Sequence, residues 1–374
     1  MIITLFTNYL NHYQIDLAKE FNKIPDVVYK IVLTEPLPDE RKDLGWVELY
    51  YENQVKAYEN ATSEAKAAAL CVESDVVLFG SCPEKYVQLR MAANKLSFRF
   101  SERIFKNLKN RIDPRVYYHL YKSNTVYKDK KFYLLSTGAY AAPDFNLVGA
   151  FKQKSFRWGY FPRVPQYDID ACLAQKQDKT VRFLWVGRLI DWKHPEQAIQ
   201  LISDLVKKGF DCQLKIVGTG HLDNQLKAKV TELNLDNHIE FIGGLLPDKV
   251  HQLMMASNVF LFTSDRGEGW GVVLNEAMSA GCTVIAYDKI GAVPYMINDG
   301  VNGIIYHNYS EFLNKTTYLL QNPAQINAFA RKAYATMLST WNPQIAVERL
   351  VHVSKNILNG DTIDLYKDGL LSLT

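Results

Sequence analysis

The chain has 374 residues, which exceeds the ~250–300 residues at which a single hydrophobic core stops growing, so we expect two domains. Hydrophobic residues make up 48% of the chain and charged residues 22%, a globular composition that excludes wholesale disorder. The net charge of +3 is too small to indicate a nucleic-acid partner.

The cysteines and the N-terminal residues indicate the cellular compartment of the protein. The cysteines are odd in number, lie far apart and include no CxxC pair, which indicates reduced thiols of a cytoplasmic protein rather than disulfides or a zinc site. The first residues, MIITLFTNYLNHYQ, lack the basic leader of a signal peptide. No stretch approaches the ~20 apolar residues of a membrane-spanning helix. We therefore expect a soluble or peripheral protein in the cytoplasm.

The N-terminal half alternates short apolar runs with helical stretches. A helix follows the first strand after a polar turn at 8–12, and an alanine-rich helix covers 63–71. This alternation predicts a doubly wound parallel sheet. The predicted strands are 2–7, 27–33, 76–79, 96–100, 132–135 and one ending at Trp158.

The segment that ends near residue 179 is polar and weakly patterned, and a second alternating series follows it. Its predicted strands are 181–186, 213–217, 239–242, 259–262, 282–286 and 303–306, with helices such as 195–207 and 247–256 between them. We expect domains at 1–162 and 163–342, and a C-terminal segment, 343–374, that begins with a helix.

The stretch 259–286, VFLFTSDRGEGWGVVLNEAMSAGCTVIA, predicts a strand, a glycine-rich loop, a helix and another strand. Gly281 stands where a helix C-cap glycine belongs. Glu268 lies in the loop and Glu276 in the apolar helix, where a carboxylate needs hydroxyl or amide donors. The amides of the helix N-terminus form a site for a phosphate. A nucleotide sugar carries both the phosphate and the hydroxyls.

This pattern, Glu268-x7-Glu276 within EGWGVVLNEAMSAGCTVIA, resembles the signature of retaining glycosyltransferases of family 4, which have the GT-B fold. The resemblance is strong over 182–306 and looser in the N-terminal half, which is similar to bacterial enzymes of surface-polysaccharide assembly. It implies two Rossmann-like, doubly wound parallel-sheet domains that face each other across a cleft. It also implies that the final helix crosses back to the first domain.

The end of the first strand of the second domain carries cations suited to a diphosphate. Gly187 permits close approach, Arg188 offers a planar fork and Lys193 a mobile point charge. The resemblance assigns both cations to the donor pyrophosphate, where they oppose the charge of the leaving group without a metal. A basic surface turn is the alternative explanation.

The resemblance also assigns the rest of the donor site. Glu276 binds the ribose hydroxyls, and the loop around Glu268 binds the donor sugar, with Trp270 at a position often held by Phe as an aromatic floor. A dinucleotide fingerprint is absent, because Asp223 breaks the pattern that Gly218 and Gly220 begin. The further donor-binding residues are Ile242 and Gly243, which face the base, and Gly269, Gly271 and Val272.

On the acceptor side, Asn11 and His12 occupy the first strand–helix loop. His12 either takes part in catalysis by contacting the sugar or phosphate, or hydrogen-bonds within its turn. Glu102 and Arg103 follow the strand 96–100 and are candidates for acceptor binding. A helix N-cap at Ser101 accounts equally well for this sequence.

Residues 95–131 carry eleven lysines and arginines against three acidic residues, with four tyrosines among them. Basic and aromatic side chains together suit the headgroup layer of an anionic membrane. A solvated basic face is an equally good explanation, and no nucleic-acid module is evident.

We therefore expect a retaining, metal-independent glycosyltransferase without a cofactor. It moves a sugar from a UDP- or GDP-sugar donor to a hydroxyl of a glycan or lipid-linked acceptor, at the cytoplasmic face of the membrane if that acceptor is lipid-linked. Glu268 positions and stabilises the sugar rather than attacking it. The alternative is a nucleotide-sugar-binding partner subunit that has lost transfer.

Overall fold

The computed structural model describes residues 1–43, 47–177 and 179–374, which form two compact units. The first unit comprises Met1–Arg163 and Asn342–Thr374, and the second comprises Val164–Trp341. These limits lie within one residue of the predicted domain limits.

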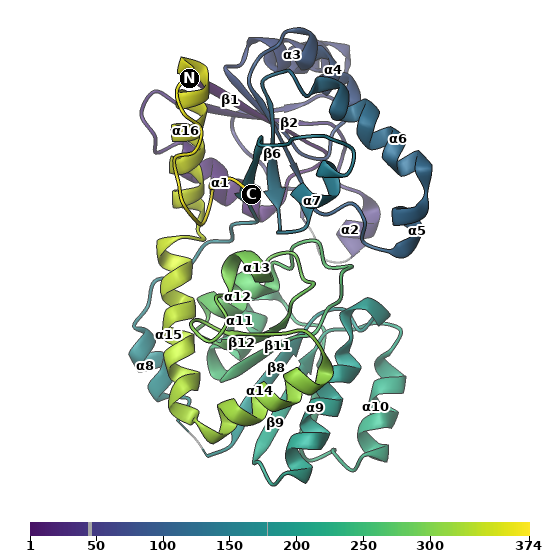
Figure 1. Ribbon diagram of the computed structural model, residues 1–374, viewed down its shortest axis with the longest axis vertical. Coiled ribbons are helices and arrows are strands. Elements are labelled where there is room, and N and C mark those ends of the chain that lie inside the picture. The colour runs from purple at the N-terminus through teal and green to yellow at the C-terminus, as the bar shows by residue number, and fades with distance from the viewer. Residues whose placement is uncertain (44–46, 178) are drawn as a thin grey trace. The chain divides into compact units, whose positions relative to one another are not determined.

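The first unit is built on a sheet of seven parallel strands in the order β3-β2-β1-β4-β5-β6-β7 (Figure 1). Strand order reverses between β1 and β4, as in a doubly wound sheet. The strands are β1 (Ile2–Thr7), β2 (Val28–Leu33), β3 (Gln54–Lys56), β4 (Val76–Phe79), β5 (Ser97–Ser101), β6 (Phe132–Thr137) and β7 (Ser155–Trp158).

Helices of the first unit connect these strands, and one returns from the end of the chain. The last helix, α16 (Pro343–Asn359), packs against α1 (His12–Phe21). The other helices are α2 (Asp39–Asp43), α3 (Ala61–Glu73), α4 (Glu84–Ala92), α5 (Leu108–Ile112), α6 (Pro114–Ser123), η1 (Thr125–Tyr127) and α7 (Ala141–Asn146).

The apolar runs of the central strands form the core of the first unit. All four residues of β4 are buried, because both faces of a parallel sheet are covered by helices. Phe6, Phe79 and Phe132 belong to one buried cluster that also includes Phe145 of α7. Full burial of such a side chain contributes about 1.5–3 kcal/mol.

Both edges of this sheet differ from what the sequence predicts. The edge strand β3 has three half-buried residues and no apolar run, so the pattern did not reveal it. At the other edge, the C-terminal residues pair with β7: Arg157 N donates to Ser372 O at 2.9 Å and Leu371 N donates to Arg157 O at 3.0 Å. Leu370 and Leu371 are fully buried there. The tail therefore covers an edge that would otherwise be open to pairing.

The second unit contains six parallel strands in the order β10-β9-β8-β11-β12-β13, with the reversal between β8 and β11. The predicted fold class of two doubly wound parallel sheets is thus confirmed. The strands are β8 (Val181–Val186), β9 (Cys212–Val217), β10 (Ile239–Gly243), β11 (Val259–Phe262), β12 (Thr283–Tyr287) and β13 (Ile304–Tyr306).

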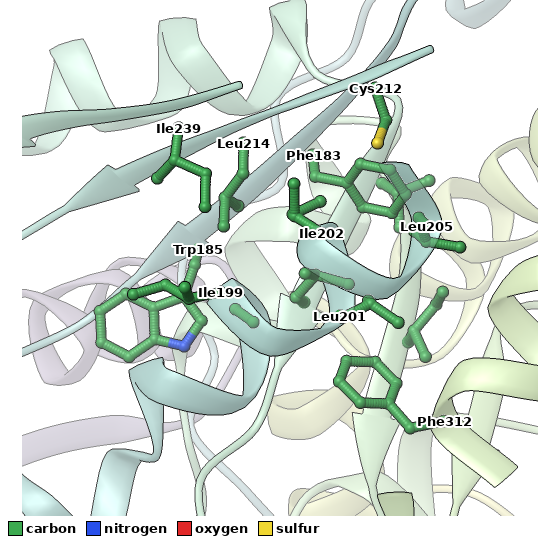
Figure 2. Close-up of a cluster of buried hydrophobic side chains, with 14 of the residues drawn as sticks. Phe183, Trp185, Ile199, Leu201, Ile202, Leu205, Cys212, Leu214, Ile239 and Phe312 are labelled. Carbon is green, nitrogen blue, oxygen red and sulfur yellow. The ribbon is translucent and has the colours of Figure 1, made fainter. Parts of the chain in front are cut away.

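A large apolar cluster joins one face of this sheet to α9, with Phe183, Leu214, Ile202 and Phe312 among its members (Figure 2). The helices of the unit are α8 (Ile169–Ala174), η2 (Asp191–Lys193), α9 (Pro195–Lys207), α10 (Asp223–Glu232), α11 (Pro247–Ala256), α12 (Val273–Ser279), α13 (Val293–Met296), α14 (Tyr309–Gln321) and α15 (Pro323–Ser339).

Two local predictions about helix ends have opposite outcomes. Gly281 has φ +67° directly after the C-cap of α12, which confirms it as the glycine that ends that helix. Ser101 is instead the last residue of β5, and no helix begins there. The proposed N-cap at Ser101 is wrong, because the chain stays extended to that residue to complete its pairing with β6.

Across the described residues, no helix combines the length and the apolar character that a membrane crossing requires.

Candidate functional site

The reversal of strand order in the second unit puts the ends of β8 and β11 side by side. In open α/β sheets, ligands bind outside the carboxyl ends of the strands at such a point. The loop after β8 begins at Gly187, and the loop after β11 contains Glu268. Both loops, singled out from the sequence, therefore lie at the one place on this sheet where a ligand is expected.

The loops after β8, β9 and β10 are joined through their backbones. Gly187 N donates to Val217 O at 3.0 Å, and Gly218 N donates to Gly243 O at 2.8 Å. A Cβ added to Gly218 would lie 1.8 Å from the carbonyl oxygen of Gly187, and its φ is +137°. Glycine is therefore required at 218 both by space and by backbone conformation. Gly187 and Gly243 therefore lie on either side of Gly218, at the carboxyl edge of the sheet.

The loops after β8 and β11 meet through side chains. Lys193 Nζ donates to Glu268 Oε2, and the two side chains are only 13% and 12% exposed. An ion pair so shielded from water is stronger than a surface pair. The cation assigned to the pyrophosphate and the carboxylate assigned to the sugar are therefore direct neighbours, although 75 positions separate them in sequence.

Further hydrogen bonds fix the same two loops, and the sequence did not reveal them. Asp265 N donates to Trp192 O at 2.9 Å, and the Thr263 hydroxyl donates to Lys193 O at 2.8 Å. Trp185 Nε1 donates to the Thr263 oxygen in turn at 2.9 Å. Thr263 could have been identified as a site residue from the sequence, because it is a polar residue directly after a buried strand.

The loop after β12 supports the Glu268 loop through backbone hydrogen bonds. Gly291 N donates to Glu268 O at 3.2 Å, and Ala292 N donates to Trp270 O at 3.1 Å. A Cβ on Gly291 would lie 1.7 Å from Gly269 O, so a side chain is excluded there. Gly291 follows a predicted strand, and that position could have identified it as a site residue.

Trp270 requires a correction. Its side chain is fully buried, packs against Trp341 with ring centroids 5.6 Å apart, and donates from Nε1 to Asn275 Oδ1 at 2.9 Å. The expectation that its indole forms an aromatic floor for the sugar is wrong, because the ring anchors the loop in the core of the unit. A contact through its backbone stays a prediction, as does a contact through Gly269.

Gly271 and Val272 lead from this loop into α12. Gly271 has φ +93°, and a Cβ there would lie 2.4 Å from the ring of Phe262. Val272 is the N-cap residue of α12 and is half-buried. The backbone can therefore turn sharply into the helix at this point, which leaves the first amides of α12 beside the loop.

Glu276 lies in the first turn of α12 and is half-buried. Burial raises the pKa of its carboxyl to about 7. We find no hydrogen-bond donor to this carboxylate among the described residues. The side chain can therefore accept hydrogen bonds from a ligand, as the sequence argument requires.

The remaining donor-side residues lie at the same edge of the sheet. Arg188 is exposed and its guanidinium lies 5.8 Å from the ring centroid of Trp192. Ile242 and Gly243 end β10 and are half-buried. Arg188 has no carboxylate partner among the described residues, so its charge is available.

The acceptor-side candidates lie in the first unit, and the structure separates them. Asn11 and Glu102 line one cavity. Asn11 is also the N-cap of α1, with its Oδ1 accepting from Gln14 N at 3.1 Å. His12 is exposed on the first turn of α1 against Tyr13, and the buried Arg103 stacks on Tyr140 at 4.5 Å. Neither lines that cavity, so their roles stay predictions.

Within the part of the chain that the structure describes, no group of three or more His, Cys, Asp or Glu side chains could hold a metal ion. The expected independence of a metal is a property of the reaction and stays a prediction.

Comparison with known proteins identifies part of the second unit. Residues 174–336 match the family model "Glycosyl transferases group 1". The chain is 28% identical over 161 residues to spore coat protein SA of Bacillus subtilis, a match covering 40% of this chain and 42% of that protein. It is 30% identical over 141 residues to an uncharacterized glycosyltransferase of Methanocaldococcus jannaschii, covering 37% and 38%. These matches span less than half the length of the relatives.

Solved structures match nearly the whole chain at low identity. Sucrose-phosphate synthase from Thermosynechococcus elongatus has a TM-score of 0.70 at 14% identity, covering 96% of this chain and 100% of that one. Anabaena Alr3699/HepE in complex with UDP has a TM-score of 0.68 at 16% identity, covering 95% and 99%. Such likenesses show the fold, which is that of the GT-B glycosyltransferases.

The resemblance to glycosyltransferases is thus confirmed at this level, while family 4, its signature and retention stay predictions. Residues 174–336 match the glycosyl transferases group 1 model, within a chain of GT-B fold.

Proposed function

We propose that this protein is a retaining glycosyltransferase of family 4 that moves a sugar from a UDP-sugar to a hydroxyl of a glycan or lipid-linked acceptor. The observation that carries the proposal is the ion pair of Lys193 and Glu268 at the reversal of strand order in the second unit. A diphosphate beside the cation and a sugar beside the carboxylate use the two charges in complementary ways. UDP is favoured because it is bound in the structurally similar Alr3699/HepE.

In the proposed reaction, the bond between the sugar C1 and the diphosphate oxygen breaks while a bond forms from C1 to the acceptor oxygen on the same face. The acceptor proton passes to the leaving diphosphate. Lys193 and Arg188 stabilise the negative charge that builds on that diphosphate. Glu268 positions the sugar and stabilises the positive charge at its ring, and Glu276 accepts hydrogen bonds from the ribose.

We further propose that the acceptor is presented at an anionic membrane. The α5–α6 surface, defined by Arg111, Ile112, Arg115, Tyr118, Tyr121 and Lys122, is exposed on the first unit. Ile112 is 72% exposed, Tyr118 62% and Tyr121 51%. Apolar and aromatic side chains beside basic ones suit the headgroup layer of an anionic bilayer. We place the protein on the cytoplasmic side of this membrane because its cysteines are free thiols.

Turnover by the purified chain tests the central proposal. Release of UDP from UDP-glucose or UDP-galactose, with water or a lipid-linked glycan as acceptor, is expected for the native protein. Glu268→Gln should lower the rate by roughly 100-fold, as for loss of one group that stabilises a transition state. The control is Glu240→Gln, an exposed glutamate on β10.

The alternative function is a partner subunit that binds a nucleotide sugar without transferring it. Thermal shift separates the two: a ligand at 100 times its dissociation constant adds ~2.7 kcal/mol of stability. Stabilisation by UDP-sugars without turnover, in the presence of the acceptor, would favour the partner subunit. Stabilisation by none of the UDP-, GDP-, ADP- and TDP-sugars would remove both.

A further inference from the structure

His194 has an unusual backbone conformation for a residue with a side chain. It follows Lys193, is the N-cap residue of α9 and has φ +51° and ψ +49°. Glycine adopts this left-handed conformation at no steric cost, whereas a side chain costs free energy there. Such a residue is kept where the surrounding structure makes use of it, so the contacts of its imidazole ring are informative.

Both ring nitrogens of His194 face carboxylates. Nδ1 lies 2.8 Å from Glu196 Oε1 in the first turn of α9, and Nε2 lies 3.4 Å from Asp265 Oδ2 in the loop after β11. A neutral imidazole carries one N–H, so it can donate to only one of these carboxylates and turns a lone pair towards the other. The protonated ring donates to both. The geometry of the three side chains therefore fits an imidazolium.

The turn that leads to Glu268 is built on Asp265. Asp265 Oδ1 accepts from Gly267 N at 2.6 Å, and the carbonyl oxygen of Asp265 accepts from Glu268 N at 3.1 Å. His194 contacts the other carboxylate oxygen, Oδ2, and so leaves the bond from Gly267 intact. Through Asp265, the imidazole joins the segment that carries Lys193 to the turn that carries Glu268.

The same two carboxylates favour the charged form of the ring. The hydrogen bond with Glu196 raises the pKa of the imidazole above its ordinary value of 6.5, and Asp265 raises it further, while burial opposes them. No other titratable side chain among the described residues shifts this pKa, and the neighbouring Lys193 directs its Nζ to Glu268. The contribution of the pair of contacts to stability is therefore fully present below pH 6.5 and is lost as pH rises through the pKa of the folded protein.

We propose that His194 is a positioning residue for the transfer: its imidazolium, held between Glu196 and Asp265, fixes the turn that carries Glu268, and the turn loosens when the ring is neutral. The inference deepens the proposed function and rests on it, because it adds a control by pH to the same site. A Glu268 carboxylate that is held less firmly stabilises the sugar less well in the transition state. The rate of transfer should therefore fall as the ring loses its proton.

Hydrogen exchange of the full chain measures the loosening without turnover. The amides of Gly267 and Glu268, both bonded to Asp265, are followed by mass spectrometry from about pH 6 to pH 8.5. Each rate is compared with that of an open amide at the same pH, which gives the protection of the turn. This protection should fall about fivefold as pH rises, the size expected for loss of a partly exposed ion pair.

Variants assign the effect to the ring. His194→Gly removes the imidazole and keeps the fold, because glycine suits φ +51°, so protection should be low at every pH. Asp265→Asn keeps an oxygen for Gly267 N and removes the charge, and it should behave in the same way. The double variant should lose no more protection than either single one. His307→Gly is the control, since it removes an exposed imidazole 3.0 Å from a carboxylate oxygen of Asp288 and should keep the native profile.

Release of UDP from UDP-glucose or UDP-galactose connects the loosening to the reaction. At saturating donor, where the effect of Glu276 on affinity does not enter, kcat of the native protein should exceed that of His194→Gly about fivefold near pH 6. The two values should converge near pH 8.5, once the native ring is neutral. Glu196→Gln keeps the ring but removes the largest cause of its raised pKa, so its kcat should converge with that of His194→Gly at a lower pH.

The outcomes separate the inference from the function on which it rests. Equal protection in the native protein and His194→Gly near pH 6 overturns it, as does a native pH profile in that variant. Loss of protection with equal kcat in the two proteins also overturns it, since His194 then acts on stability alone, and it leaves the proposed function standing. Loss of protection together with no UDP release by the native protein counts against the proposed function and supports the hold of His194 on the turn.

Discussion

Glu276 combines a half-buried carboxyl with the absence of a hydrogen-bond donor among the described residues, so the proposed nucleotide binding should depend on pH. With the pKa near 7, the carboxyl is protonated at pH 6 and ionised at pH 8. Ribose hydroxyls bind the ionised form better, so affinity for UDP-glucose should rise ~10-fold from pH 6 to pH 8. Calorimetry at several pH values measures this, since the diphosphate of a nucleotide sugar does not titrate in that range.

In Glu276→Gln the affinity should be lower and independent of pH, whereas Glu240→Gln should keep the native profile. A pH profile that survives in Glu276→Gln would assign the titration to another group. The effect on stability has the opposite sign. The folded protein holds this proton between pH 4.5 and about 7 while the unfolded chain does not, so the contribution of Glu276 to stability falls as pH rises through that window.

In the proposed reaction, Arg188 and Lys193 supply the positive charge that a metal would otherwise bring to the diphosphate. Transfer should therefore persist in excess EDTA. Lys193→Met should lower kcat by roughly 100-fold, because one of the groups that stabilise the leaving group is lost. Steady-state rates with and without EDTA measure both effects. Loss of activity on chelation, restored by manganese or magnesium, would show that this assignment of charge is wrong.

At the scale of elements, Arg90 of α4 holds together three segments of the first unit. Its side chain is fully buried and donates to the carbonyl oxygens of Cys71 at 3.0 Å, Ser74 at 2.7 Å and Leu96 at 2.7 Å. These carbonyls belong to the end of α3, the residue after it and the residue before β5. The arginine fork thus pairs the carbonyls of Cys71 and Ser74 at the end of α3, and it adds a second donor to Leu96 O, which also accepts from Val77 N at 3.3 Å.

Arg90→Met should lower the free energy of unfolding of the first unit by about 3 kcal/mol, because several buried carbonyls lose their donors at once. Urea denaturation measures the change. Arg115→Met, at a side chain that is 87% exposed, should stay within ~0.5 kcal/mol of the native protein. Equal stability of the two variants would contradict the role given to Arg90.

The exposed basic side chains of α5 and α6 yield a prediction about membranes. Triple reversal of Lys109, Arg111 and Lys122 to Glu should weaken binding to anionic vesicles 100-fold or more, since each nearby basic residue contributes ~1 kcal/mol. Lys106 is left out because it pairs with Glu102. Cosedimentation measures binding, and native binding should weaken in high salt as screening increases.

The matched control reverses Lys66, Lys332 and Lys355, which are exposed on other helices. That variant should bind anionic vesicles as the native chain does, and UDP affinity should be unchanged in both triples. Equal binding of the native protein to neutral and anionic vesicles would leave the α5–α6 surface as a solvated face.

Across the whole molecule, the sequence predicted what depends on runs of apolar residues. Strands β8 and β11 carry their signal in four consecutive apolar side chains, 183–186 and 259–262, and both strands were predicted with the limits observed. The edge strand β3 and the pairing of the tail with β7 carry no such signal. They are set by backbone hydrogen bonds to a neighbouring strand, which any polar sequence can make.

Some residues of the candidate site could be predicted from the sequence, and others could not. Glycines at strand ends and Glu276 in an apolar helix stand out in sequence, because each violates a local preference. The pairing of Lys193 with Glu268 and the burial of Trp270 could not be predicted, because both depend on which loops meet in space. The resemblance placed the indole of Trp270 in the pocket, whereas its burial against Trp341 places it in the core.

The first unit is discontinuous, and this has a consequence for its synthesis. The ribosome completes Arg163 and must then make the whole second unit before Asn342–Thr374 emerges. At ~5–20 residues per second, that interval is on the order of 10 s or more. During it, the nascent first unit lacks both the partner of α1 and the segment that covers β7. Its open strand edge is then available to chaperones or to a neighbouring nascent chain, while the second unit, unbroken in sequence, is free to fold first.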